Sequence, residues 1–180
     1  MGCTSTVSAA LISRLGGQAV YDTDRNITWQ ANASASGTMT WTAANAWAAG
    51  LNIGGYTGWR LPTALNADGS GPCLNFNCTG SELGHLFYTE GGLSQGQSIT
   101  SSTYLNQFFT GMQNSFYWLG SDGYYFRTLS GAQAAPNSSG LAWAVRTGDV
   151  GGGSVPEPGI LGLMGIGALA WSATRSRRLG

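Results

Sequence analysis

The sequence predicts a small α+β domain with two short helices and antiparallel strands. Both helix signals fall in the first half of the chain, and aromatic segments separated by turns fill the second half. Helices and strands that are segregated along a chain in this way are typical of the α+β class. Hydrophobic residues make up 42% of the 180 residues, which is enough for a packed core. We expect the folded domain to occupy residues 11–150.

The strands are predicted from apolar and aromatic segments that flank turns. Residues 18–21 and 27–29 lie on either side of a turn containing Asp and Asn, a pattern that favours a β-hairpin. Residues 117–119 and 124–126 flank a Ser-Asp-Gly turn and predict a second hairpin. Residues 141–145 are expected to form a closing strand.

The first helix is predicted to end near Leu51. Thr40 or Thr42 can accept a hydrogen bond from the free amides of its first turn. Ala43, Trp47 and Leu51 follow one another at intervals of four residues. Because residues four apart share one side of a helix, we expect these three to form its buried face.

The second helix begins with a capping-box pattern, in which Thr79 lies three residues before Glu82. In a capping box these two side chains bind each other's free backbone amides. The glycine pair at residues 91–92 is expected to end the helix. Its predicted apolar face consists of Leu83, Leu86 and Phe87.

Charged residues make up only 9% of the chain, against about 25% in an average soluble domain. All eight basic residues are arginines, and three of them lie in the last six positions. Residues 11–150 hold five arginines and seven acidic residues, which gives this part a net charge of −2. Nucleic-acid binding needs a basic patch, so we expect no nucleic-acid partner.

Two of the three cysteines, Cys73 and Cys78, lie in a loop rich in Gly, Pro and Asn at residues 69–80. In an exported protein this arrangement favours a disulfide, which stabilises a short loop by about 2 kcal/mol. A metal site is the alternative, but it needs further thiols or imidazoles, and His85 is the single histidine. Cys3 has no predicted partner.

The C-terminal segment consists of a linker, a proline pair, an apolar stretch and a basic end. Residues 151–154 form a flexible Gly/Ser linker, and the prolines that follow it prevent a continuous helix. Residues 159–171 are apolar or Gly and predict a tail helix of about 20–24 Å. Because the hydrocarbon core of a bilayer is about 30 Å thick, we expect only transient attachment to the inner membrane. The residues that define the segment are Val155, Pro156, Glu157, Pro158, Arg175, Arg177 and Arg178.

In order and position, residues 155–180 resemble a PEP-CTERM sorting signal. The resemblance implies that an exosortase, a membrane protease, recognises this segment and removes it during export. It also implies a location at the cell surface or in the extracellular matrix.

An exported protein also needs a secretory signal peptide with a basic start and an apolar run. Residues 1–10 have no basic residue, and their apolar stretch is interrupted by Ser8. We interpret them as a truncated or non-native leader and expect the signal peptide upstream of Met1.

The body of the chain contains a series of short motifs rich in aromatic residues. They are Val20-Tyr21-Asp22, Thr28-Trp29, Trp41, Trp47, Gly58-Trp59-Arg60-Leu61-Pro62-Thr63, Cys78-Thr79-Gly80-Ser81-Glu82-Leu83-Gly84, Tyr117-Trp118 and Ala142-Trp143-Ala144-Val145-Arg146. In that order they resemble the domain of unknown function in the C-terminal part of a bacterial collagen-like adhesin. The resemblance implies a variant of the C-type-lectin and formylglycine-generating-enzyme superfold.

No pattern in the sequence predicts a catalytic or metal site. His85 lies off the apolar face of the second helix, so we expect a surface histidine. Asp22 and Asp24 share one turn, but Arg25 follows them, and calcium needs further oxygen ligands. The sugar-and-calcium triplets of C-type lectins are also missing from the sequence. We therefore expect no enzymatic activity, no bound metal and no cofactor.

The aromatic and cationic side chains of the motifs are expected to be structural. Arg60 and Arg146 are expected to pair with buried carbonyls or with Glu82. A sugar-binding surface is the alternative for the tryptophans, because aromatic faces stack on pyranose rings. The tryptophans expected in the core are Trp29, Trp41, Trp47, Trp59, Trp118 and Trp143.

These features predict a non-enzymatic surface or matrix protein that an exosortase processes, with adhesion or association with exopolysaccharide as its role. The alternative is a carbohydrate-binding module of lectin-like fold without the calcium site. A third hypothesis is an oxidase of the formylglycine-generating type, since those enzymes use two cysteines with the same gap as Cys73 and Cys78. The ligand of the body is not predicted.

Overall fold

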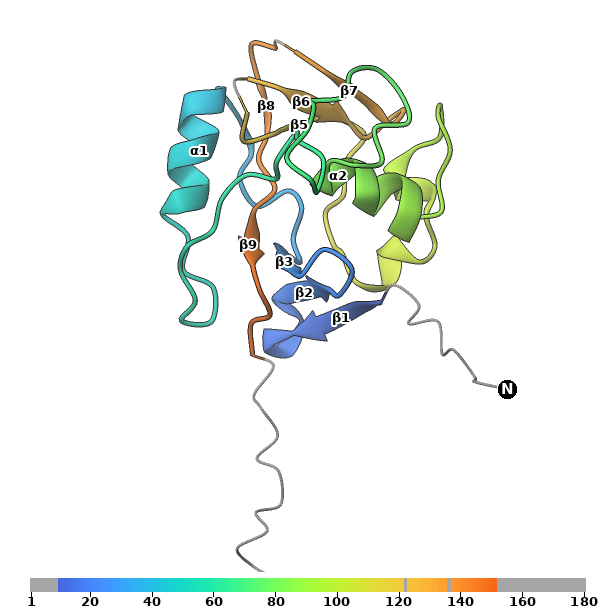
Figure 1. The fold of residues 1–180 in the computed structure, drawn as a ribbon. Helices are drawn as coiled ribbons and strands as arrows, with labels where there is room; N and C mark the ends of the chain where they lie inside the picture. Colours follow the sequence, from blue (N-terminus) through green and yellow to red (C-terminus); the bar gives the residue numbers. More distant parts are fainter. Residues whose placement is uncertain (1–9, 122, 136, 152–180) are drawn as a thin grey trace, which may run out of the picture.

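The fold consists of two β-sheets with short helices that join and flank them (Figure 1). The computed structural model describes residues 10–121, 123–135 and 137–151. Its helices are few and short, and its strands pair mainly in the antiparallel sense. The prediction of a small mixed domain with antiparallel strands is therefore confirmed.

The first sheet has the strand order β1-β2-β3-β9, and each pair in it is antiparallel. The predicted first hairpin is the β2–β3 pair, in which Val20 pairs with Trp29. Its turn is held by Asp22, whose Oδ1 accepts hydrogen bonds from the amides of Asp24 and Arg25 at 3.1 and 3.0 Å. The strands are β1 (Leu11–Arg14), β2 (Ala19–Asp22), β3 (Ile27–Gln30) and β9 (Val145–Thr147).

The second sheet has the order β4-β8-β5-β6-β7 and contains one parallel pair, β5 with β8. The predicted second hairpin is the antiparallel β5–β6 pair, in which Trp118 pairs with Tyr125. The strands are β4 (Thr38–Met39), β5 (Phe116–Trp118), β6 (Tyr125–Arg127), β7 (Ala132–Ala134) and β8 (Gly140–Leu141).

The predicted closing strand over residues 141–145 is wrong, because the segment is divided between the two sheets. Leu141 ends β8 in the second sheet, and Val145 begins β9 in the first. Between them Trp143 is fully buried, and its indole Nε1 donates to the Gln30 carbonyl oxygen at 2.7 Å. Val145 and Arg60 also exchange two backbone hydrogen bonds of 2.8 Å, which fix the start of β9.

Most of the expected core tryptophans are buried as predicted. Trp29, Trp59, Trp118 and Trp143 are at most 2% exposed. The rings of Trp29 and Trp143 lie 5.2 Å apart between the sheets, in the tilted arrangement that aromatic pairs favour. The remaining two, Trp41 and Trp47, are only partly buried.

Helix α1 (Trp41–Ala49) begins at Thr40, whose side chain accepts from the Ala43 amide. The predicted buried face is wrong by about one residue: Ala43 is exposed, whereas Ala44 and Ala48 are fully buried. Small alanines on this side allow the helix to approach the apolar cluster that contains Trp59 and Trp118. Trp47 and Leu51 lie at the edge of that contact.

Helix α2 (Glu82–His85) continues as a wider π-helical turn over Leu86–Glu90, labelled η2. The expected apolar face is confirmed, since Leu83, Leu86 and Phe87 are fully buried. The expected capping box is wrong, because the cap is Ser81, which accepts from the Gly84 amide at 3.2 Å. Glu82 does not reach back to the helix start, because its carboxylate binds Arg60 instead.

Three short 3₁₀ turns complete the described chain: Leu15–Gly17, Ile99–Ser101 and Leu105–Gln107. Among the described residues, no helix has the length and apolar character needed to cross a bilayer. The predicted tail helix and the sorting residues at 155–180 lie outside the described part of the chain.

Candidate functional site

The predicted disulfide is present between Cys73 and Cys78, with the Cα atoms 5.5 Å apart. Its loop is held against the second sheet by Gln133, which is fully buried in β7. The Gln133 side-chain amide donates to the carbonyls of Ala64 and Cys73 at 3.0 and 2.8 Å. The backbones of Gln133 and Asn75 also exchange two hydrogen bonds of 2.7 Å, so the loop is fixed both at its first cysteine and between the two cysteines.

The segment at residues 58–63 is joined to α2 by an ion pair whose carboxylate is buried. Arg60 donates two hydrogen bonds of 2.7 Å to the carboxylate of Glu82, which is 7% exposed. The Thr63 amide donates a third at 2.8 Å. The carboxylate raises the pKa of Arg60 through these hydrogen bonds, against the opposing effect of burial. This confirms the predicted structural role of Arg60.

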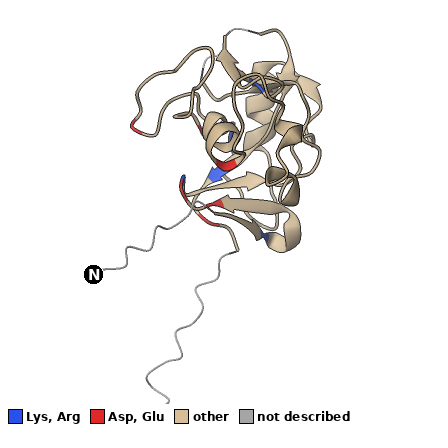
Figure 2. Cartoon of the chain, turned by 90° about the vertical axis from the view of Figure 1, so that its right-hand side faces the viewer, with Lys and Arg blue, Asp and Glu red and all other residues tan. Residues whose placement is uncertain are grey.

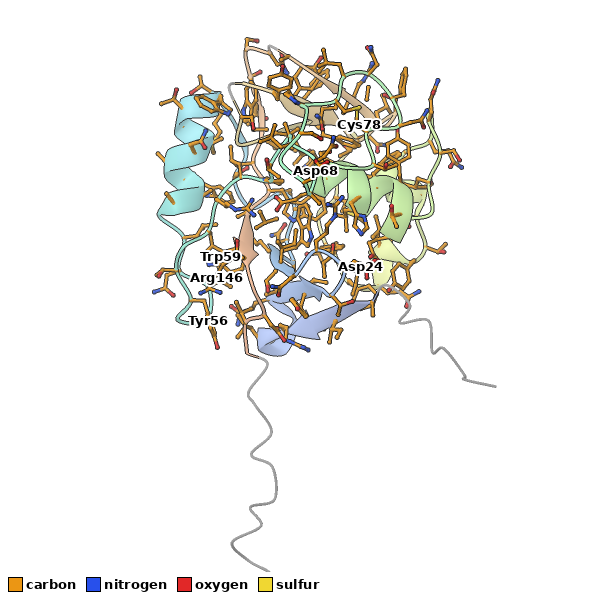
Figure 3. All side chains as sticks on the ribbon, in the orientation of Figure 1. Asp24, Tyr56, Trp59, Asp68, Cys78 and Arg146 are labelled. Atoms are coloured by element: carbon orange, nitrogen blue, oxygen red, sulfur yellow. A yellow bond between two sulfur atoms is a disulfide. The ribbon has the colours of Figure 1, made fainter. Side chains whose placement is uncertain are left out.

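Arg146 is also structural, as predicted. Its Nε donates to the Thr57 carbonyl oxygen at 2.8 Å, and its guanidinium lies 5.6 Å from the centre of the Tyr56 ring. Figure 3 shows Arg146 and Tyr56 together beside β9, with Trp59 next to them. The pair ties the loop after α1 to the closing strand of the first sheet.

A polar cleft of about 480 Å³ lies between the β2–β3 turn, the segment after Arg60 and α2. Arg25 closes one side of it, since its Nη2 donates to the carbonyls of Thr79 and Gly80 at 2.9 and 2.8 Å. Charged residues are few on the domain (Figure 2), and three of them, Asp24, Arg25 and Glu82, line this cleft. The polar side chains that line it are Asp24, Arg25, Thr63, Asn66, Glu82 and His85.

His85 lines this cleft and also belongs to a cluster of three ionisable side chains beneath it. Asp22 at the end of β2, His85 at the end of α2 and Glu90 at the end of η2 place one potential ligand atom each within 4.8 Å of the others. The Nε2 of His85 lies 3.4 Å from Oε1 of Glu90 and 3.9 Å from Oδ2 of Asp24. Asp24 is seen on the turn below α2 in Figure 3.

The prediction of a surface histidine is therefore wrong. The His85 side chain is only 11% exposed, and it lies over Glu90 and the fully buried Asp22. Removal from water raises the pKa of the Asp22 carboxyl, and the hydrogen bond from the Arg25 amide opposes this rise. The cluster can bind a cation or share protons, which are the two ways in which proteins stabilise buried carboxylates.

The π-helical turn explains why the sequence did not reveal this cluster. In an α-helix, residues five apart point about 140° away from each other. The wider turn is marked by a hydrogen bond of 2.9 Å from the Gly91 amide to the Leu86 carbonyl, five residues back. It carries Glu90 to the same side of the chain as His85, which a pattern of α-helical periodicity misses.

Comparison with known proteins identifies the end of the chain alone. Residues 154–178 match the PEP-CTERM protein-sorting motif. The motif marks an exported, surface-directed protein that an exosortase sorts, as the resemblance of residues 155–180 implied. No curated protein and no solved structure matches the chain.

Proposed function

We propose that the folded domain is a non-enzymatic module of the cell surface or extracellular matrix, which contributes to adhesion or associates with exopolysaccharide. The observation that carries the proposal is the sorting motif at residues 154–178. Six residues separate it from the end of β9 at Thr147. The low content of charged residues supports it, because such a surface suits a protein outside the cytosol. The adhesive role is suggested by the motifs in the body that resemble the collagen-like adhesin domain, whose superfold is lectin-like. This resemblance rests on the sequence alone.

The disulfide supports a structural rather than an oxidising role for the cysteines. Cys78 is 1% exposed and Cys73 is partly buried, and the backbone of Cys73 is held by Gln133. A bond fixed in this way is a poor partner for the thiol exchange that an oxidase of the formylglycine-generating type needs. Thiol titration tests this point, since a bridge that mild reductant opens readily would favour the oxidase.

The sorting step is tested by expressing the full chain behind an added signal peptide, in hosts with and without an exosortase. We expect a loss of mass that corresponds to the C-terminal segment in the exosortase host alone. The control carries Pro156→Ala, Glu157→Ala and Pro158→Ala together and should keep its full mass in both hosts. Identical masses of the unchanged chain in the two hosts would contradict the sorting proposal.

A second candidate function is calcium-independent carbohydrate binding. The cleft favours it, because Asp24, Thr63 and Asn66 offer hydrogen-bonding groups to hydroxyls along one open surface. The burial of four tryptophans weakens it, because they offer no exposed face for stacking on a sugar ring. A glycan array with the exported protein and its Asn66→Ala variant distinguishes the two proposals: specific binding that the variant loses would favour the carbohydrate-binding module.

A further inference from the structure

The cluster of Asp22, His85 and Glu90 has the composition and burial of a cation site. Asp22 is fully buried, the Glu90 side chain is 2% exposed and the His85 side chain is 11% exposed. The three residues come from β2, α2 and η2, so the packing of the first sheet against the helices brings them together. Asp22 and His85 lie 63 positions apart in the sequence, so the site depends on the tertiary fold.

Each of the three side chains has an inward atom that lacks a hydrogen-bond partner. These atoms are Oδ2 of Asp22, Nε2 of His85 and Oε1 of Glu90, all of them shielded from solvent. The other oxygen of Asp22 is fixed by the amides of Asp24 and Arg25, so the free oxygen is held toward the cluster. A buried carboxylate without a partner costs several kcal/mol, and two of them together cost more.

No arginine among the described residues forms an ion pair with these carboxylates. Arg25 is the nearest guanidinium on the same turn, but its Nη2 binds the Thr79 and Gly80 carbonyls. Asp24 adds a third carboxylate, at 3.9 Å from His85 Nε2. A bound cation would supply the positive charge that these carboxylates lack.

One distance in the cluster matches a small tetrahedral metal ion, and all three ligand atoms lie within 4.8 Å of one another. Two ligand atoms that each lie about 2.05 Å from Zn²⁺, at the tetrahedral angle, are about 3.3–3.4 Å apart. The His85 Nε2 to Glu90 Oε1 distance is 3.4 Å. One imidazole nitrogen and carboxylate oxygens are also donors that Zn²⁺ accepts, whereas Ca²⁺ and Mg²⁺ prefer oxygen alone.

We propose that Asp22, His85 and Glu90 bind one Zn²⁺ ion, which joins the β2–β3 turn to the end of α2. The cleft gives the ion a route from solvent, because His85 and Asp24 line it. A water molecule from the cleft completes the four ligands that Zn²⁺ requires. The π-helical turn is then the device that sets Glu90 opposite His85, in keeping with the frequent occurrence of such turns at functional sites.

The test uses the full chain carrying Cys3→Ser, so that the cysteine outside the disulfide cannot bind Zn²⁺. After removal of metal with EDTA, we expect the chain to bind one equivalent of Zn²⁺. Its thermal midpoint should rise by about 4 °C for each tenfold increase of Zn²⁺ above the dissociation constant. Ca²⁺ and Mg²⁺ at the same concentrations should leave the midpoint unchanged.

The ligand variants are Asp22→Asn, His85→Gln and Glu90→Gln, which keep the approximate size of each side chain. Each should weaken Zn²⁺ binding by about 100-fold or more, because loss of even an indirect partner of a metal costs 10- to 100-fold. The matched control is Asp68→Asn, which removes an exposed carboxylate outside the cluster and should not change the affinity.

Three results would overturn the proposal. The first is a wild-type midpoint that does not depend on Zn²⁺, which would show that the cluster does not bind the ion. The second is a ligand variant that binds Zn²⁺ as tightly as the Asp68→Asn control. The third is an equal response to Ca²⁺. If a ligand variant does not fold, the Zn²⁺ titration of the wild-type chain alone decides the proposal. Exosortase sorting is measured in a separate experiment, so its failure would not affect the Zn²⁺ result.

Discussion

Replacing Arg60 by alanine should destabilise the domain far more than replacing Arg14, although both arginines bind a carboxylate with two hydrogen bonds. Arg14 binds Asp149 at 2.7 and 2.9 Å, and Arg60 binds Glu82 at 2.7 Å twice. The difference is burial. The side chains of Arg14 and Asp149 are 20% and 29% exposed, whereas those of Arg60 and Glu82 are 40% and 9% exposed, so the two pairs differ in the burial of the carboxylate. The two variants therefore separate the effect of burial from the effect of hydrogen-bond geometry.

The expected loss of unfolding free energy depends on the environment of the carboxylate that each variant leaves without its arginine. Removing one partner of a fully buried ion pair costs about 3–5 kcal/mol, because the other charge stays buried without compensation. The Arg60 side chain is 40% exposed, and the Thr63 amide still binds Glu82, so we expect about 2 kcal/mol. Exposed pairs contribute about 0.2–1 kcal/mol, so Arg14→Ala should cost about 0.5 kcal/mol.

Urea unfolding of the full chain, followed by tryptophan fluorescence, measures both costs. With a slope of about 2 kcal/mol per M, Arg60→Ala should lower the midpoint by about 1 M and Arg14→Ala by about 0.3 M or less. Glu82→Gln combined with Arg60→Ala should cost less than the sum of the single variants. Equal midpoints for the two alanine variants, or strict additivity in the double variant, would refute the argument from burial.

Three further predictions concern a buried phenol, the disulfide and a helical glycine. Burial raises the pKa of Tyr117 to about 12, so the unfolded chain ionises first, and stability should fall by about 2–3 kcal/mol between pH 10 and pH 12. Urea midpoints across this range check the fall, and Tyr117→Phe should remove it. Replacing Cys73 and Cys78 by serine should cost about 2 kcal/mol in the same assay, as expected for a short closed loop. Gly84→Ala should prevent folding or lower the thermal midpoint by more than 10 °C, because its Cβ would lie 1.9 Å from the Cys78 carbonyl oxygen. The control Gly50→Ala meets its nearest atom at 3.4 Å and should change the midpoint by at most a few degrees.

The hairpins and the disulfide could be predicted because local sequence determines them. The turn after β2 needs Asp22 to bind the amides that follow it, and that requirement is visible within a few residues. The same holds for the cap of α1 at Thr40, which is chemically suited to accept from a free amide. In these cases the interacting groups are neighbours in the chain.

The errors arose where distant residues compete with local patterns. Glu82 is well placed for a capping box, but a charge-assisted hydrogen bond to Arg60 is stronger than one to a backbone amide. The segment at residues 141–145 looks like one strand, but its ends pair with different sheets. His85 was expected at the surface because its partners, Asp22 and Glu90, become neighbours through tertiary packing and a π-helical turn.

The division of the closing segment between β8 and β9 affects the order in which an exported chain can fold. The second sheet needs β8 and is incomplete before residue 141 is available, and the first sheet needs β9 and is incomplete before residue 147 is available. The sorting motif begins at residue 154, and only residues 148–153 separate it from β9. The last strand of the fold therefore lies only a few residues before the sorting motif, so the domain can be completed only when nearly all of the chain that precedes the motif is available.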